Sequence, residues 1–328
     1  MSIPLVSVCC ITYNHENYIG DAVEGFLSQR TTFPVEVIIH DDASTDRTAG
    51  IIKKYANRYP EIVIPILQEV NQYSKGIKPS TTYVWPRAKG KYIALCEGDD
   101  FWTDPLKLQK QVDFLENNKD FVLSFHNTIG INEDKGYPEQ IKMVNQLLQL
   151  PPEKVPVEHR THTCSLFFRN IIKDFPKEYF EVVNSDTFLI FLLSRHGKRI
   201  YQNDIYPSVR RYHKTSVWAS KGLEYKKKQK INTYSKMLEI AINDDERNRI
   251  KVNIIKEHIQ IFQHQFSRFK IRSGFKNLFV TLKIAIKQKN LLLFCLYGLP
   301  GLYYLSRIPY KVYAKLKYYM SNSLTIKS

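Results

Sequence analysis

The chain has 328 residues, 43% of them hydrophobic, and its 48 Lys and Arg against 32 Asp and Glu give a formal net charge of +16. This length allows one large α/β domain with an appendage, and the hydrophobic content allows a sizeable core. Residues 1–220 carry 26 basic and 26 acidic side chains, so the whole excess falls in residues 221–328. A localised basic excess indicates an anionic surface; no nucleic-acid recognition motif accompanies it, which excludes nucleic acid in favour of a membrane.

The five cysteines show none of the spacings of a metal-binding motif. Cys9 and Cys10 are adjacent in an apolar run, where a strand directs them to opposite faces. We therefore expect buried free thiols in a reducing compartment. No charged leader precedes the strand-like run that begins at Leu5, so we expect no signal peptide and a cytoplasmic chain.

Strand and helix patterns alternate along the first half of the chain. Short apolar runs predict buried parallel strands, and apolar residues three or four positions apart predict helices. The predicted order is strand 6–11, helix 19–28, strand 35–40, a helix ending before Pro60, strand 62–67, strand 92–96, a helix after Asp104 and strand 121–125. This order predicts an α/β fold with a doubly wound, mostly parallel sheet.

The second half of the chain is less regular. Residues 126–160 are rich in Pro, Lys and Glu and are expected to form a surface excursion. Further predicted elements are strand 165–168, helix 186–196, and strands 199–202 and 208–212. After Gly222 the pattern is helical, which predicts a C-terminal helical extension.

Polar and acidic residues follow three of the predicted parallel strands. They are Thr12-Tyr13-Asn14, Asp41-Asp42 and Glu97-Gly98-Asp99-Asp100. Ligands of such sheets bind beyond the carboxyl ends of the strands. Three coincident strand ends therefore indicate a site more strongly than any one motif.

Glu97-Gly98-Asp99-Asp100 places three carboxylates within four residues. Their mutual repulsion is relieved if a divalent cation binds there, and carboxylate oxygens suit Mg²⁺ or Mn²⁺. Such a cation would in turn hold a diphosphate. The alternative is an acidic turn that solvates its charges and caps the next helix.

Asp41 and Asp42 are a second candidate binding feature. An acid at a strand end can accept a hydrogen bond from a base N–H or a ribose hydroxyl. Residues 44–46 are Ser, Thr and Asp, which also suit the start of a helix. The two interpretations use different residues and are compatible.

Several ordered stretches resemble one known family. They are Val6–Val8 with Thr12–Asn14, Ile38–Thr48 and Lys89–Trp102. Together they resemble glycosyltransferase family 2, inverting enzymes of bacterial polysaccharide type with a GT-A fold. Ser185–Leu189, Gly197-Lys198 and Arg210–Lys214 resemble the acceptor half of the same family, so the resemblance covers residues 3–220.

The resemblance implies roles on the donor side. Asp41 would recognise the nucleotide base, with Asp42 and the loop of Thr12, Tyr13 and Asn14 around it. The donor would be a nucleoside diphosphate sugar, with a UDP-sugar favoured.

The resemblance also implies roles in the chemistry. Asp99 stands in the family's DXD motif and would be the chief metal and diphosphate contact. Glu97 is one methylene longer than the Asp of that motif, so we do not expect it to contact the metal directly. Glu97 and Asp100 are both expected to lie near the donor. Asp186 stands where the family keeps its general base, and His213 where many members supply a metal ligand.

The segment Asn71–Arg87 departs from the family's commoner pattern, because it lacks an arginine-asparagine pair. Lys75 or Lys78 is expected to take over the phosphate contact, and Arg210 or Arg211 to stabilise the leaving group. A single acid opposite the departing diphosphate would give one displacement with inversion. The acceptor would be a glycan or a lipid-linked glycan.

The apolar run Leu291–Leu305 carries no charge and is flanked by lysines and tyrosines. It is shorter than the about 20 apolar residues that span a bilayer. Lys and Tyr around a short apolar segment suit a helix lying in the membrane interface. The alternative is a helical pair packed on the catalytic domain.

These patterns predict a domain at 1–220, with a nucleotide-sugar half at 1–125 and an acceptor half at 126–220. Residues 221–328 would be a basic extension that anchors the protein on the inner face of the cell membrane.

Two other functions stay open. A nucleotidyltransferase is expected to have a glycine-rich basic loop after the first strand, where this chain has Thr12–Glu16. A non-catalytic nucleotide-sugar-binding or membrane-scaffold protein is disfavoured because the acids at all three strand ends are intact.

Overall fold

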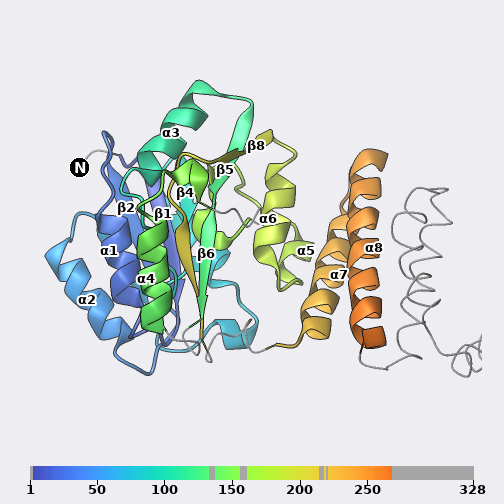
Figure 1. Ribbon diagram of the computed structural model, residues 1–328, viewed down its shortest axis with the longest axis horizontal. Coiled ribbons are helices and arrows are strands. Elements are labelled where there is room, and N and C mark those ends of the chain that lie inside the picture. The colour runs from blue at the N-terminus through green and yellow to red at the C-terminus, as the bar shows by residue number, and fades with distance from the viewer. Residues whose placement is uncertain (1–2, 133–136, 156–160, 214–217, 219–220, 268–328) are drawn as a thin grey trace, which may run out of the picture. The chain divides into compact units, whose positions relative to one another are not determined.

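The computed structural model describes residues 3–132, 137–155, 161–213, 218 and 221–267 (Figure 1). The chain divides into two compact units. The first comprises Met1–Phe180 and Ser185–Ser220, and the second comprises Glu181–Asn184 and Lys221–Ser328.

A seven-stranded sheet forms the centre of the first unit. Its strand order is β3-β2-β1-β4-β7-β5-β8, and all neighbours are parallel except β7, which is antiparallel to both β4 and β5. The predicted α/β class with a mostly parallel sheet is confirmed. The strands are β1 (Val6–Thr12), β2 (Val35–Asp41), β3 (Val63–Leu67), β4 (Tyr92–Leu95), β5 (Phe121–His126), β7 (Phe167–Arg169) and β8 (Lys198–Gln202).

The central strands are mostly apolar because both faces of the sheet are buried. Val6, Val8 and Cys10 of β1 lie in one cluster with residues of α1 (Ile19–Leu27), α2 (Thr48–Arg58) and α3 (Lys107–Asn117). Each fully buried Val or Leu side chain contributes about 1.5–3 kcal/mol. Cys9 lies outside this cluster and is also buried, in keeping with the alternation of a strand. Both thiols are free.

Residues 126–160 contain regular structure, so the expected surface excursion is wrong. Strand β6 (Thr128–Asn132) pairs in parallel with β9 (Ser208–Tyr212) in a second sheet, and α4 (Tyr137–Leu147) lies beside β6 (Figure 1). Ile129, Ile131 and Val144 form a small core with Val209. The apolar residues of β6 alternate with polar ones, and the Pro, Lys and Glu that follow conceal this pattern.

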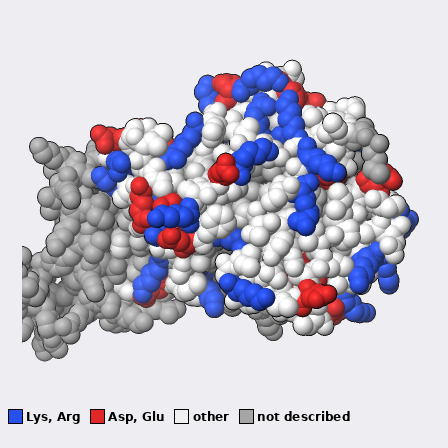
Figure 2. Space-filling view, turned by 180° about the vertical axis from the view of Figure 1, so that it is seen from behind, with Lys and Arg blue, Asp and Glu red and all other residues white. Residues whose placement is uncertain are grey.

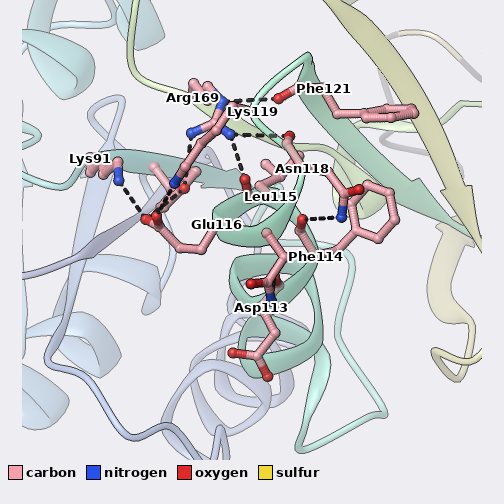
Figure 3. Close-up of polar contacts among 11 residues, drawn as sticks. Lys91, Asp113, Phe114, Leu115, Glu116, Asn118, Lys119, Phe121 and Arg169 are labelled. Atoms are coloured by element: carbon pink, nitrogen blue, oxygen red, sulfur yellow. Dashed lines mark hydrogen bonds and ion pairs between the residues drawn. The ribbon is translucent and has the colours of Figure 1, made fainter.

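Arg169, at the end of β7, holds the carboxyl end of α3 (Figure 3). Its guanidinium donates to the carbonyl oxygens of Leu115, Asn118 and Phe121. The last carbonyls of a helix have no partner within the helix, so Arg169 supplies one. Glu116 of the same turn accepts hydrogen bonds from the Tyr92 hydroxyl and the Lys91 and Lys119 ammonium groups. The network therefore ties the end of α3 to strands β4 and β7.

The second unit contains helices α7 (Leu223–Glu239) and α8 (Asp244–Ser267), which pack on each other. Lys227 pairs with Glu257 at 2.9 Å across this hairpin. The helical pattern predicted after Gly222 is thus confirmed up to residue 267. The apolar run at 291–305, its flanking lysines and Cys295 lie outside the described residues.

Basic and acidic side chains of the described residues lie intermixed on the face shown in Figure 2. Within the described part of the chain, no helix combines the length and the apolar character needed to cross a membrane.

Candidate active site

Residues 97–100 form a turn directly after β4, at the carboxyl edge of the sheet. The N–H of Gly98 donates to the carbonyl oxygen of Ile11 at 3.0 Å. A Cβ at Gly98 would come within 2.5 Å of the Thr12 hydroxyl oxygen, so glycine lets the turn pack on the end of β1. This packing brings Asp99 beside the loop that follows β1.

Asp99 lies beside two histidines. Its Oδ2 is 3.1 Å from Nε2 of His213 and 3.9 Å from Nε2 of His15. The three side chains offer ligand atoms within 4.8 Å of one another, and the buried Oδ1 of Asp99 has no hydrogen-bond partner. A carboxylate oxygen left unpaired beside imidazoles fits a divalent cation.

Arg211 joins the acidic turn to strand β9. Its N–H donates to Oδ1 of Asp100 at 3.0 Å, and its guanidinium donates to the carbonyl oxygen of Asp99 at 2.9 Å and to the Asp21 carboxylate. A β-bridge between Phe101 and Val209 lies beside these bonds. The side chain of Arg211 is fully buried, so this arginine holds the turn in place.

The charges in the turn perturb one another. Burial and the neighbouring carboxylates raise the pKa of Glu97 and of Asp100, while the Arg210 guanidinium opposes both shifts. Burial also disfavours the anion of Asp99, but the His213 hydrogen bond and the nearby His15 outweigh it and lower the pKa of Asp99. Within the turn, the anionic form is therefore favoured most at Asp99, the residue closest to the histidines.

The loops after β1 and β2 are tied together at the same edge. Asp41 accepts hydrogen bonds from the N–H and the hydroxyl of Ser44, and burial raises the pKa of Asp41. Oδ1 of Asn14 accepts the N–H of Thr45 at 2.8 Å, and Asn14 has a positive φ of 54°. Tyr13, between Thr12 and Asn14, is exposed.

Asp42 is turned toward the next loop. Its carboxylate accepts the backbone N–H groups of Gln72 and Tyr73 at 2.8 and 3.0 Å. These bonds position the short helix Tyr73–Lys75, where Lys75 is exposed.

Asp186 lies in the first turn of helix α6 (Ser185–Leu193), and its Oδ1 accepts a hydrogen bond from the N–H of Thr187 at 2.7 Å. Its charge contributes to the raised pKa of Glu97, which shows that it lies within electrostatic reach of the acidic turn. Lys78 donates a hydrogen bond to the hydroxyl of Ser185.

The structure thus gathers most residues singled out in the sequence at one edge of the sheet. Asp99, Asp100, Arg210, Arg211 and His213 lie in or beside the acidic turn. Sequence reasoning missed His15, although it directly follows the polar loop after β1. It also missed Asp21, whose partner Arg211 is 190 positions away.

Comparison with known proteins places this arrangement in a family. Residues 7–175 match the model of the family described as Glycosyl transferase family 2. The uncharacterized protein Rv1520 of Mycobacterium tuberculosis is 43% identical over 164 residues, which cover 50% of this chain and 46% of that protein. The Escherichia coli protein named UDP-Glc:alpha-D-GlcNAc-diphosphoundecaprenol beta-1,3-glucosyltransferase WfaP is 34% identical over 149 residues, or 45% of this chain and 53% of WfaP. The chain thus spans about half the length of these relatives.

Two solved structures share the fold. Staphylococcus aureus TarS 1–349 in complex with UDP-GlcNAc superposes with a TM-score of 0.57 at 17% identity, over 85% of this chain and 81% of that one. The mannosyltransferase PcManGT from Pyrobaculum calidifontis, in complex with GDP-Man and Mn²⁺, gives a TM-score of 0.55 at 16% identity over 100% and 89% of the two chains.

Proposed function

Since the chain belongs to glycosyl transferase family 2 and is a glycosyltransferase, we propose that it moves a sugar from a UDP-sugar to a hydroxyl of a glycan or lipid-linked glycan, with inversion. The family membership favours glycosyl transfer over the nucleotidyl transfer considered from the sequence. One observation carries the proposal: the Asp99–His213 pair at the carboxyl edge of the sheet, with a carboxylate oxygen left unpaired.

UDP is the proposed nucleotide. TarS has been solved with UDP and with UDP-GlcNAc, and the name of WfaP gives UDP-glucose as its donor. PcManGT is solved in complex with GDP-Man, so the identity of the nucleotide base requires a test. Asp41 at the end of β2, with the Thr12–Asn14 loop beside it, is the proposed nucleoside contact.

The proposed metal is Mn²⁺, with Mg²⁺ as the alternative. Asp99 and His213 would hold it, and His15 lies close enough to join them. Mg²⁺ strongly prefers oxygen ligands and retained water, so a site with imidazoles favours Mn²⁺. When bound, such a cation neutralises charge on the diphosphate.

Asp186 is the proposed base. The acceptor oxygen attacks the anomeric carbon, the bond from that carbon to the phosphate oxygen breaks, and UDP leaves with the bonding pair. The acceptor proton passes to the Asp186 carboxylate. General-base assistance of this kind contributes about 10²–10⁴-fold. One displacement gives inversion at the anomeric carbon.

A membrane-bound acceptor is the proposed reason for the basic tail. Residues 268–328 carry 12 Lys and Arg and no Asp or Glu. Each basic residue near an anionic leaflet adds about 1 kcal/mol of attraction. The name of WfaP gives a diphosphoundecaprenol-linked acceptor.

A panel of nucleotide sugars tests the donor. The full chain is incubated with UDP-glucose, UDP-GlcNAc, UDP-galactose or GDP-mannose, with Mn²⁺ or with EDTA, and release of the nucleotide is measured. We expect UDP release from one UDP-sugar and none in EDTA. Release of GDP alone would contradict the proposal that UDP is the nucleotide of the donor. Absence of both turnover and nucleotide binding would overturn the proposed donor class.

A further inference from the structure

We propose that Lys78 is a positioning residue for Asp186: it fixes the first turn of α6 and places a positive charge within electrostatic reach of the Asp186 carboxylate. This inference rests on the role of Asp186 as the base in the proposed function. It assigns to Lys78 a task other than contact with the donor phosphates.

The contacts of Lys78 lead to α6. Its ammonium donates to the hydroxyl of Ser185, the first residue of the helix, across 107 positions of chain. The same ammonium lies 4.9 Å from the centre of the Tyr179 ring. Tyr179 is itself fully buried, so it provides a rigid surface under the lysine. Lys78 is thus held between helix α5 (Lys177–Phe180) and the residue preceding Asp186.

Electrostatics connect Lys78 with Asp186. Burial lowers the pKa of Lys78 to about 8, and the Asp186 carboxylate opposes this shift. Asp186 therefore lies within electrostatic reach of the Lys78 ammonium. The attraction between the two charges adds to the hydrogen bond through Ser185 in positioning Asp186.

The N-terminus of α6 acts in the same direction. Asp186 lies in the first turn, where helix N–H groups favour a negative side chain. Lys78 holds that turn through Ser185, so the position of Asp186 depends on this lysine. Placing an ammonium in a partly buried site carries a desolvation cost that lowers the free energy of unfolding. A cost of this kind is expected where function, not stability, retains the residue.

Three variants test this role. Lys78→Met removes the charge and keeps the aliphatic chain, Lys78→Arg retains the charge, and Lys54→Met removes an exposed lysine of α2 as a matched control. Turnover is followed as UDP release from the preferred UDP-sugar with Mn²⁺, and UDP affinity is measured by calorimetry. We expect Lys78→Met to lower turnover about 10- to 100-fold with UDP affinity nearly unchanged. Lys78→Arg should recover part of the loss, and Lys54→Met should match wild type.

A double-mutant cycle shows whether Lys78 acts through Asp186. In an Asp186→Asn background, Lys78→Met should cause almost no further loss, because the group it positions is already gone. If the two losses instead multiply, Lys78 acts independently and the inference is wrong. Weaker UDP binding by Lys78→Met would make Lys78 a donor contact and would also overturn it.

Thermal unfolding gives a readout that needs no substrate. Lys78→Met should melt at the wild-type temperature or higher, since a buried charge is removed. A melting temperature several degrees lower would mean that Lys78 is a packing residue, contrary to the inference. Failure of the proposed function appears differently, as a wild-type protein that binds neither UDP nor GDP with Mn²⁺.

Discussion

The imidazole of His213 lies 3.1 Å from the carboxylate of Asp99, although 114 positions of chain separate the two residues. His213 lies beyond residues 7–175, the part of the chain that matches the family model. The candidate site is therefore completed by the segment after that match, which also contributes Asp186 and Arg211.

Asp99→Asn tests the proposed metal site. The amide loses the charge that a cation needs, so we expect Mn²⁺-dependent UDP binding to disappear and donor hydrolysis to fall by about 100-fold or more. Asp113→Asn, in an exposed position on α3, is the matched control and should keep wild-type activity. Calorimetry and UDP release measure the two effects. Full wild-type activity in excess EDTA would contradict metal dependence.

Asp186→Asn tests the proposed base. Turnover should fall about 10²- to 10⁴-fold while UDP-sugar affinity survives, because the base acts on the acceptor. Steady-state kinetics and calorimetry separate the two quantities. NMR of the product should show an inverted anomeric configuration. A collapse of donor affinity would identify Asp186 as a donor-side or structural residue instead.

Arg169→Leu tests the network at the end of α3. The change leaves the carbonyls of Leu115 and Phe121 without their donors, at about 1–3 kcal/mol for each buried group. We expect the free energy of unfolding to fall by about 3 kcal/mol, measured in urea, with UDP affinity retained. Lys119→Met, at an exposed position nearby, should change stability by less than about 0.5 kcal/mol. An equal loss of free energy of unfolding in both variants would contradict the capping role of Arg169.

Lys107 should make stability depend on pH. Its ammonium is buried 3.9 Å from the centre of the Trp102 ring, and burial lowers the pKa of Lys107 to about 7. An unfolded lysine has a pKa of about 10.4, so between pH 7 and 10 the unfolded chain binds more protons. Stability relative to Lys107→Met should therefore rise with pH, by at most about 1.4 kcal/mol per unit. The titratable groups around Lys107 are Cys96, Cys164, Asp104 and His126.

Urea unfolding of wild type and Lys107→Met at pH 7, 8 and 9 measures this difference. Contributions from the other groups cancel to the extent that both proteins share them. Lys54→Met, which changes an exposed lysine, should run parallel to wild type. If the free energy of unfolding of Lys107→Met changes with pH in the same way as that of wild type, Lys107 keeps an ordinary affinity for its proton and the prediction is wrong.

The basic tail is tested with vesicles. Deleting residues 290–328 removes the apolar run at 291–305, and changing Lys311, Lys315 and Lys317 to Gln removes only charge. Both proteins should sediment less with anionic liposomes than wild type, and salt should weaken the wild-type interaction. Donor hydrolysis should persist, because the proposed catalytic residues precede position 220. A wild type that stays in the supernatant at all salt concentrations would contradict membrane binding.

Local patterns were sufficient to predict the parallel strands. Runs such as Val6–Ile11 and Val35–His40 are mostly apolar, and a sheet covered on both faces accounts for them. Strand β6 was missed because it has only 5 residues and the Pro, Lys and Glu that follow conceal its alternating pattern. Its partner β9 lies about 80 positions later in the chain. Pairing over that distance depends on tertiary packing, which no local pattern encodes.

Positions within the candidate site were predictable where they follow a strand. Asp99 is located by the end of β4, and its neighbourhood follows from the sheet. The roles of Lys75 and Lys78 were not separable from sequence, because both belong to a segment of short helical turns and only the fold brings Lys78 to Ser185. His15 was missed for a similar reason: its proximity to Asp99 depends on how the turn at Gly98 packs.

During translation the acidic turn is synthesised well before Arg211 and His213, which contact it in the folded protein. Arg211 and His213 follow Asp99 by 112 and 114 residues, which takes on the order of 5–20 s at the usual rate of synthesis. During that interval the nascent chain can pair β1 to β4, yet its carboxylates have neither the guanidinium nor the imidazole that later contacts them. Competence to bind the donor should therefore arise at a late stage of translation, after residue 213 has left the exit tunnel.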